Sequence, residues 1–375
     1  MREQIKIVIR PGGLTHNETR DWLRLARTPR VGPVTFFKLL ERFKTASAAL
    51  KALPNLGAKT SPISPLSKDE IEREMARISD HGARILCACE DDFPKLLNQF
   101  TPPPPVLIVL GDIALANRRC VAIVGARQAS AAGRKLARDI ASALSAANFT
   151  IVSGLARGID GEAHAASLNG GTIAVLGGGI DHIYPPQHER LYTEIAANGL
   201  LVSESPFGHR ATARDFPRRN RIITGLAEGV VIIEAAERSG SLISARTALE
   251  QNREVMSVPG SPLDPRTAGS NRLLRQGATL VRHADDVIEA LARPTPRQMS
   301  APSSPFDDDA RENHEDIPPS QRELVRESLG PTPVRIQDIA RATQLSVPRC
   351  ASILVELELA GLARTYAGGL ASIAI

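Results

Sequence analysis

The 375-residue sequence has few aromatic side chains, four cysteines and no long hydrophobic run. Phe, Trp and Tyr together make up 3% of the residues, so any surface on which flat ligands stack must be built from few side chains. Cys87 and Cys89 lie two apart, and Cys120 and Cys350 stand alone, which favours buried, reduced thiols over disulfides. Because no apolar run reaches about 18 residues and no signal-peptide pattern is present, we expect a soluble, cytoplasmic protein.

Signatures of nucleotide cofactors and metal ions are also missing. The first turn of the predicted sheet, residues 125–133, reads GARQASAAG and lacks the G-x-G-x-x-G of dinucleotide-binding proteins. The second strand ends at Ser153, where those proteins carry an acidic residue for the ribose hydroxyl. No G-x-x-x-x-G-K-[ST] is present, and no cysteine or second histidine lies at ligand spacing from His164. We therefore expect no organic cofactor, no metal ion and no catalytic residue.

Basic residues exceed acidic ones only slightly. Lys and Arg number 46 and Asp and Glu 41, a net charge of +5, which by itself does not establish nucleic-acid binding. The clustering of arginines is more informative, because Arg218, Arg219 and Arg221 precede an apolar run, 229–233, that predicts a buried strand. Ser239-Gly240-Ser241 then opens a helical pattern. Unpaired amides at a helix N-terminus beside three guanidinium groups favour the binding of phosphate.

The middle of the sequence, residues 106–292, alternates short apolar runs with helical patterns. This alternation predicts an α/β domain with a doubly wound parallel sheet, in which ligands bind beyond the carboxyl ends of the strands. Arg127 directly follows the first strand and is our main candidate for a ligand-binding residue; the alternative is a structural pair with a neighbouring carboxylate. The predicted strands are 120–124, 150–153, 172–176, 200–203, 229–233 and 254–258.

Other polar residues at the strand ends have structural explanations. Asp160 stands where a helix N-cap is expected, and His164 fits a packed position in the same helix. Glu204 and Glu234 would repel a phosphate if they faced it, so we expect each of them to orient an arginine or cap a turn. The arginines remain the main ligand-binding candidates.

The N-terminal part of the sequence reads as short helices. The helical pattern of residues 18–53 is interrupted at residues 29–33, PRVGP. This link resembles a helix-hairpin-helix turn, and a plain small helical bundle fits the pattern equally well. Pro102 to Pro105 end the region, because consecutive prolines cannot continue a helix.

The C-terminal part begins with a change of composition. Residues 293–318 are rich in proline, serine and aspartate and predict a flexible linker. Three helical patterns and a hairpin around Gly368-Gly369 then resemble a winged helix. Glu356 and Glu358 on its third helix argue against strong groove binding, so contact of this module with DNA stays open. The predicted domains are 1–100, 101–292 and 319–375, with the linker at 293–318.

A series of short motifs resembles one known family. In chain order they are SGLARGID (153–160), LGGGIDHIYPPQHERL (176–191), SESPFG (203–208), FPRRNRIITGL (216–226), EAAERSGSLISA (234–245), VPG (258–260) and SNRLLRQGA (270–278). They resemble successive signatures of the DNA-processing protein A family, also called DprA or Smf. The resemblance implies a Rossmann-like core, an N-terminal helical domain of the SAM or helix-hairpin-helix type and a C-terminal winged helix. It also implies single-stranded DNA binding, protection of incoming DNA, loading of RecA recombinase during natural transformation, and a homodimer formed through the sheet domain.

The resemblance also places the DNA-binding site. The family's strand-binding arginine matches Arg127, with a pocket built from residues around it. After Tyr184-Pro185 some members carry a basic residue where this sequence has Pro186 and Gln187, so either the rim contact is weaker here or Arg190 replaces it. From the residues and the resemblance together, the expected single-stranded DNA contacts are Gly125, Arg127, Ser153, Gly154, Arg157, Arg218, Arg219, Asn220, Arg221, Ser239, Gly240 and Ser241.

A second class of function is kept as an alternative. The sheet architecture is similar to that of the nucleotide phosphoribohydrolases (the lysine decarboxylase-like family), which cleave a base from a nucleoside monophosphate with an arginine and a glutamate. Those enzymes carry P-G-G-x-G-T-x-x-E at a helix start, whereas the corresponding stretch here, residues 238–243, lacks the glycine pair and the glutamate. The sequence therefore favours binding over catalysis.

Overall fold

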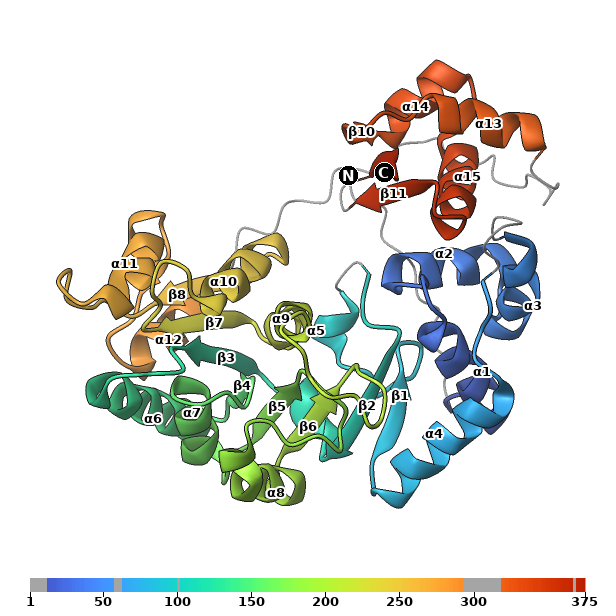
Figure 1. Ribbon diagram of the computed structural model, residues 1–375. Helices are drawn as coiled ribbons and strands as arrows, with labels where there is room; N and C mark the ends of the chain where they lie inside the picture. Colours follow the sequence, from blue (N-terminus) through green and yellow to red (C-terminus); the bar gives the residue numbers. More distant parts are fainter. Residues whose placement is uncertain (1–11, 57–62, 100–101, 293–317, 367–368, 375) are drawn as a thin grey trace. The chain divides into compact units, whose positions relative to one another are not determined.

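The computed structural model describes residues 12–56, 63–99, 102–292, 318–366 and 369–374 (Figure 1). The chain divides into two compact units, one with the described parts of Thr15–Ile71 and Pro296–Ile375 and the other with those of Ile7–Leu14 and Glu72–Thr295. The predicted linker, 293–318, lies outside the described residues except for Pro318. Within the described ranges, no helix is both long and apolar enough to cross a membrane.

The larger unit is built on a mixed, mainly parallel sheet. Its strands are β1 (Arg84–Cys87), β2 (Val106–Gly111), β3 (Cys120–Gly125), β4 (Thr150–Ser153), β5 (Thr172–Leu176), β6 (Leu200–Ser203), β7 (Gly229–Ile233), β8 (Glu254–Ser257) and β9 (Thr279–Leu280). Their order in the described sheet is β1-β2-β6-β5-β4-β3-β7-β8-β9. The pairs β1-β2 and β2-β6 are antiparallel, and the others are parallel. From β3 the chain runs outward to β6 and then returns to β7 on the other side of β3, which is the doubly wound arrangement.

The predicted α/β class and the six predicted strands are confirmed, four of them with the predicted bounds. The sequence does not predict β1, β2 or β9. The first two extend the sheet with antiparallel pairs, and β9 has two residues, too few to show a strand pattern. Because β1 lies before residue 101, the sheet begins N-terminal to the boundary predicted for the sheet domain.

Helices cover both faces of this sheet. They are α5 (Lys95–Asn98), α6 (Ala131–Ala146), α7 (Ile159–Ser167), α8 (Glu189–Asn198), α9 (Asp215–Leu226), α10 (Gly240–Glu250), α11 (Ala268–Arg275) and α12 (Ala284–Ala292), with short 3-10 helices η1 (Ile113–Asn117), η2 (Pro186–His188) and η3 (Pro265–Thr267). Ser130 caps α6 by accepting a hydrogen bond from the Gly133 N–H at 2.9 Å. Ile140 and Leu144, four residues apart on α6, are buried in one cluster with Ile123 of β3. α7 and α12 join this cluster, whereas α9 and α10 pack against each other on the opposite side of the sheet (Figure 1).

The smaller unit combines N-terminal helices with a winged helix. Its described elements are α1 (His16–Arg27), α2 (Pro33–Phe43), α3 (Ala46–Leu56), the start of α4 (Lys68–Asp80), α13 (Pro319–Glu327), β10 (Val334–Arg335), α14 (Ile336–Thr343), α15 (Val347–Leu359), β11 (Ala363–Tyr366) and β12 (Leu370–Ile373). Trp22 of α1 and Phe36 of α2 pack with their ring centres 5.1 Å apart, so the apolar stripes of the two helices face each other. The three helices and the β11-β12 hairpin predicted for the C-terminal part are confirmed.

The two acidic residues of α15 are engaged inside this unit. Glu356 is 4% exposed and pairs with Arg42 at 2.6 Å and also with Arg322. Glu358 accepts hydrogen bonds from the N–H of Thr365 at 3.1 Å and from its hydroxyl at 2.6 Å. Both carboxylates are therefore neutralised or hydrogen-bonded by the protein itself and do not present unpaired charge to a ligand.

A substitution at Gly158 tests the described conformation of the loops at the strand ends. The φ of this glycine is +78°, and a Cβ atom there would lie 2.3 Å from the carbonyl oxygen of Ala126 and 2.7 Å from that of Arg127. Gly158→Ala should lower the free energy of unfolding by about 2 kcal/mol or more, because the left-handed backbone is strained for alanine and the loop after β3 must shift. Urea titrations measure this change. The matched control is Gly240→Ala, whose Cβ position has no atom within 4 Å, so its stability should stay within about 1 kcal/mol of wild type. Equal stability of Gly158→Ala and wild type would contradict the described loop.

Candidate functional site

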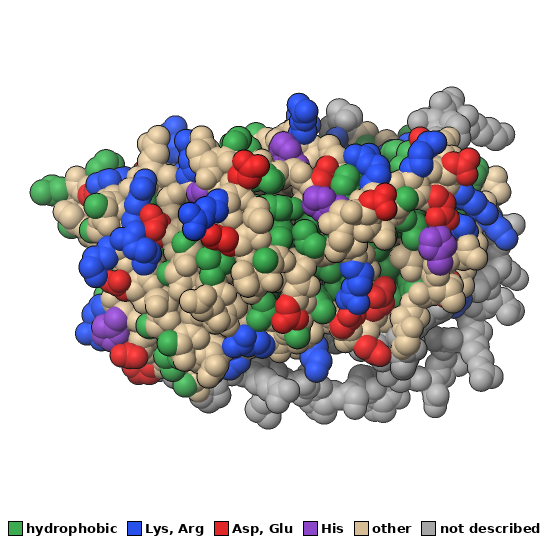
Figure 2. Space-filling view, turned by 90° about the horizontal axis from the view of Figure 1, so that it is seen from below, with side chains coloured by type: hydrophobic (Ala, Val, Ile, Leu, Met, Phe, Trp, Pro, Cys, Tyr) green, Lys and Arg blue, Asp and Glu red, His purple; other side chains and the backbone are tan. Residues whose placement is uncertain are grey.

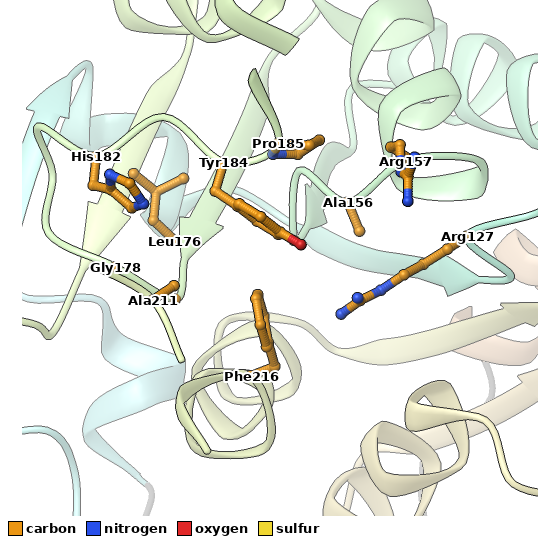
Figure 3. A pocket seen from close by; sticks show the side chains of 12 residues that line it. Arg127, Ala156, Arg157, Leu176, Gly178, His182, Tyr184, Pro185, Ala211 and Phe216 are labelled. Atoms are coloured by element: carbon orange, nitrogen blue, oxygen red, sulfur yellow. The ribbon is translucent and has the colours of Figure 1, made fainter. Parts of the chain in front are cut away.

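A pocket opens where β3, β4 and β5 end (Figure 3). These strands are neighbours in the sheet and run parallel, so the loops that follow them meet at one edge. Arg127 comes from the loop after β3, Gly154 and Arg157 come from the loop after β4, Tyr184 follows β5, and Phe216 comes from α9. Of the expected contact residues, the pocket brings together Arg127, Gly154 and Arg157.

The guanidinium of Arg127 points toward two aromatic rings (Figure 3). Its central carbon lies 4.9 Å from the centre of the Phe216 ring, and the Tyr184 and Phe216 ring centres are 5.6 Å apart. Tyr184 is 44% exposed, so the cluster is open to a ligand. No carboxylate within the described ranges pairs with Arg127, so these residues do not support the alternative of a structural ion pair. A cation beside exposed rings can bind an anion and a flat group together.

Arg219 was expected to contact the ligand directly, but the structure places it beneath the pocket. The residue is 6% exposed, and its Nη1 donates to the carbonyl oxygen of Gly154 at 2.7 Å and to that of Val175. Burial lowers the pKa of Arg219 to about 10, while the negative charge of Asp160 opposes this shift. The guanidinium therefore ties the loop after β4 to β5 and acts as a positioning group.

Asp160 also differs from its prediction. The N-cap of α7 is Gly158, and the buried carboxylate of Asp160 accepts a hydrogen bond from the Gly154 N–H at 3.1 Å. Burial raises the pKa of Asp160, and the charge of Arg219 lowers it in part. Asp160 and Arg219 thus compensate each other's charge below the pocket.

The remaining arginines of the α9 cluster share one carboxylate. Arg218 is 61% exposed and its Nε lies 3.2 Å from Oε2 of Glu204, while Arg221 pairs with the other oxygen of Glu204. The expectation that Glu204 orients an arginine is confirmed. The Asn220 side chain accepts from Nε of Arg219 at 3.3 Å and donates to the carbonyl oxygen of Gly240 at 3.5 Å.

A carboxylate occupies the start of α6, where dinucleotide-binding proteins place a phosphate. Glu234, which directly follows β7, accepts hydrogen bonds from the Ser130 N–H at 2.8 Å and from the Ser130 hydroxyl. A negative group is favourable at a helix N-terminus, and it would repel a phosphate there. The expectation that Glu234 caps a turn is confirmed.

The expected contacts around β3, β4 and β7 do not all reach the pocket. Ser153 is fully buried and its hydroxyl donates to the carbonyl oxygen of Ile123 at 2.6 Å. Gly125 packs against the carbonyl oxygen of Ile233. Ser239, Gly240 and Ser241 form the start of α10, and the Ser239 hydroxyl caps that helix by accepting from the Ser241 N–H at 3.3 Å. None of these residues belongs to the described lining of the pocket.

Sequence reasoning missed Phe216 as a site residue, although the sequence carries a signal for it. Arg219, Ile223 and Leu226 follow Phe216 at intervals of three, four and three residues, which places all four on one face of α9. Ile223 and Leu226 are buried against the sheet. Arg219 is therefore directed inward, and Phe216, one turn before it, reaches the pocket at the strand ends.

His164 holds the loop after β4 from below. The Thr172 hydroxyl donates to the carbonyl oxygen of Ile151 at 3.1 Å, so Nδ1–H of His164 donates to that hydroxyl at 2.7 Å. Nε2 then accepts from the Leu155 N–H at 3.3 Å. Burial lowers the pKa of His164 to about 3, which keeps the ring neutral, and its predicted role as a packed helix residue is confirmed.

The sheet with its cationic, aromatic-lined pocket, accompanied by a helical part and a winged helix, defines a modular protein of the α/β class. Residues 84–292 match the family described as DNA recombination-mediator protein A. Residues 16–76 match the DprA-like N-terminal helix-hairpin-helix domain, and residues 309–369 match the DprA winged-helix domain. The chain belongs to the DNA recombination-mediator protein A family.

Individual relatives agree over most of the chain. Protein Smf of Synechocystis sp. is 32% identical over 390 residues, covering 93% of this chain and 97% of that protein. Protein Smf of Escherichia coli is 37% identical over 305 residues, covering 80% of each. DNA processing protein A from Streptococcus pneumoniae superposes with a TM-score of 0.62 at 30% identity, covering 74% of this chain and 98% of that one. The protein from Helicobacter pylori, described with a unique single-stranded DNA binding mode, gives a TM-score of 0.52 at 30% identity and covers 56% of this chain and 95% of that one.

The buried, neutral His164 predicts a specific loss of stability in acid. Its folded pKa of about 3 lies below the value near 6.5 of an unfolded chain, so the unfolded state binds the proton more tightly. The stability of the strand-end region should therefore fall below pH 6.5 by roughly 1.4 kcal/mol per pH unit. Hydrogen exchange of amides in β4 and β5, corrected for intrinsic rates, measures this. His164→Gln should remove most of the slope, whereas the control His283→Gln, at an exposed position, should keep it. An unchanged slope in His164→Gln would contradict the assignment.

Proposed function

We propose that this protein binds single-stranded DNA in the pocket at the ends of β3, β4 and β5, and that it acts as a recombination mediator that protects incoming strands and loads RecA recombinase during natural transformation. One observation carries the proposal: an arginine without an ion-pair partner in the described chain, Arg127, lies over the ring of Phe216, which packs against the exposed Tyr184. Family membership and the binding mode described for the H. pylori relative support it.

The pocket suits a single strand for a physical reason. Arg127 and Arg157 provide charge for backbone phosphates, and Tyr184 and Phe216 offer faces on which an unpaired base can stack. In duplex DNA the base faces are hidden by stacking and pairing, so such a site favours single strands. Because every base has an aromatic face, we expect little dependence on sequence.

The wall of the pocket lets a strand approach closely. Gly154, Gly177 and Gly178 line it without side chains. A Cβ atom at Gly178 would lie 2.9 Å from the carbonyl oxygen of His209, so the loop after β5 packs tightly behind the pocket. A preformed wall of this kind lowers the entropy cost of binding.

The same geometry favours binding over catalysis. The nucleotide phosphoribohydrolase alternative needs a glutamate that faces the ligand. Here Glu204 pairs with Arg218 and Arg221, and Glu234 caps α6 through Ser130. These carboxylates are engaged with the protein, which supports a non-catalytic role.

We further propose a homodimer formed through the sheet domain and a cytoplasmic location. An interface through α11 would need exposed apolar side chains on that helix. Leu273 of α11 is only 8% exposed and belongs to the core. β9 is a better candidate, because it is the edge strand of the described sheet and its Leu280 is 47% exposed. The four cysteines are buried, free thiols, which supports a reducing compartment.

Substitutions in the pocket should separate phosphate contacts from stacking. Arg127→Ala should weaken oligothymidine binding and reduce the slope of log affinity against log salt by about 0.7, because one phosphate contact is lost. Tyr184→Leu should weaken binding roughly 5- to 150-fold, which corresponds to about 1–3 kcal/mol of stacking, and leave the salt slope unchanged. Fluorescence anisotropy measures both. The control is Arg246→Ala, since Arg246 is 82% exposed, pairs with Glu250 and lies outside the pocket. Wild-type binding by both pocket variants would refute the proposed site.

The dimer can be tested at the edge strand. Wild-type protein at micromolar concentration should have twice the chain mass by light scattering. Leu280→Lys should be a monomer, because it places a charge on the edge of β9. Leu263→Lys is the control at a loop position that is 93% exposed and should leave the mass unchanged. A monomeric wild type would end this proposal, and a dimeric Leu280→Lys would place the interface elsewhere.

A further inference from the structure

A second depression adjoins the pocket. It lies between the starts of α6 and α7 and the short helix η2, and its lining includes Arg134, Arg157, Glu162, Gln187 and His188. We call it the α6–α7 groove. Arg157 lines both the pocket and this groove, so the two adjoin at this residue.

The arginines of the groove differ from the other basic residues of α6, which form ion pairs. Neither Arg134 nor Arg157 has an ion-pair partner within the described chain. Other basic residues of α6 are paired: Lys135 with Asp139 at 2.5 Å and Arg138 with Glu162 at 2.7 Å. Glu162 is the single carboxylate among the described lining residues, and Arg138 neutralises it.

The floor of the groove is held in place by the protein. A Cβ atom at Gly161 would lie 2.6 Å from the ring of His188, so α7 and η2 are in close contact there. Nδ1–H of His188 donates to the carbonyl oxygen of Leu155 at 3.0 Å, which fixes the ring against the loop that carries Arg157. The groove is thus built from the same loop as the pocket.

We infer that a bound strand continues from the pocket past Arg157 into the α6–α7 groove, where Arg134 binds a further backbone phosphate. This inference rests on the proposed binding of single-stranded DNA. The start of α6 is already capped by Glu234 and Ser130, so the Arg134 side chain supplies the positive charge. Gln187 and His188 add polar edges. The ligand class of the groove is therefore the phosphate backbone of a polynucleotide, read without regard to sequence.

Oligothymidines of two lengths, about four and about sixteen nucleotides, separate the groove from the pocket. Arg134→Ala should bind the short oligonucleotide as wild type does, and should weaken the long one about fivefold at low salt with a salt slope lower by about 0.7. Arg134→Glu should weaken the long one further, and Arg134→Lys should restore the slope. Lys135→Ala, the next residue of α6 and outside the groove, is the matched control.

The outcomes distinguish this inference from the proposed function. If Arg127→Ala weakens both lengths while Arg134→Ala and Arg134→Glu bind both as wild type does, the pocket stands and the groove is excluded from the strand's path. If Arg134→Ala weakens both lengths equally, Arg134 belongs to the primary contact and the inference is overturned. If Arg127→Ala changes neither length, the proposed function itself fails.

Discussion

The strand-end site depends on two buried side chains of opposite charge. Arg219 and Asp160 lie below the pocket, and both bond to the backbone of Gly154, one through its carbonyl oxygen and the other through its N–H. A Cβ atom at Gly154 would lie 2.6 Å from the Arg219 guanidinium, so only glycine allows this approach. Removing one partner of such a pair leaves a buried charge without compensation, at a cost of about 3–5 kcal/mol. The loop that carries Arg157 and the strand that leads to Tyr184 are thereby fixed relative to each other before any ligand arrives.

The pairing of the carboxylates explains why a protein with a net charge of only +5 can present a strongly cationic site. Lys and Arg side chains lie beside Asp and Glu side chains over the face that Figure 2 shows. Near the pocket the carboxylates are engaged instead with backbone groups or with other arginines, as Glu234 is with Ser130 and Glu204 is with Arg221. Arg127 and Arg157 line the pocket, and no carboxylate of the described chain pairs with them. Their positive charge is therefore not neutralised at the site.

The sequence predicts the sheet well because buried parallel strands are continuous apolar runs with turn residues at their ends. β4, β5, β6 and β7 have the predicted bounds for this reason. It predicts β9 poorly, because a strand of two residues is too short to show a hydrophobic period.

Within the site, the spacing of residues identifies a basic cluster but not the direction of each side chain. Arg218 and Arg219 are adjacent in the sequence, yet one is mostly exposed and the other is buried, because successive residues of a helix point about 100° apart. Which arginine faces a ligand follows from the apolar stripe of α9 and not from the cluster itself.

The position of the pocket in the sheet also depends on the carboxylate of Glu234. In doubly wound sheets the crevice between the strands on either side of the reversal, here β3 and β7, commonly receives a phosphate at a helix N-terminus. Glu234 fills that place, so the cationic surface is displaced toward β4 and β5. A helix N-terminus deep in a crevice suits the terminal phosphate of a small nucleotide. A polymer has to enter and leave its site, and therefore needs an open surface with side-chain cations, such as Arg127 and Arg157 on the loops after β3 and β4. The carboxylate at the start of α6 thus takes the place that a phosphate occupies in dinucleotide-binding proteins, which agrees with the proposed binding of a continuous strand at the neighbouring loops.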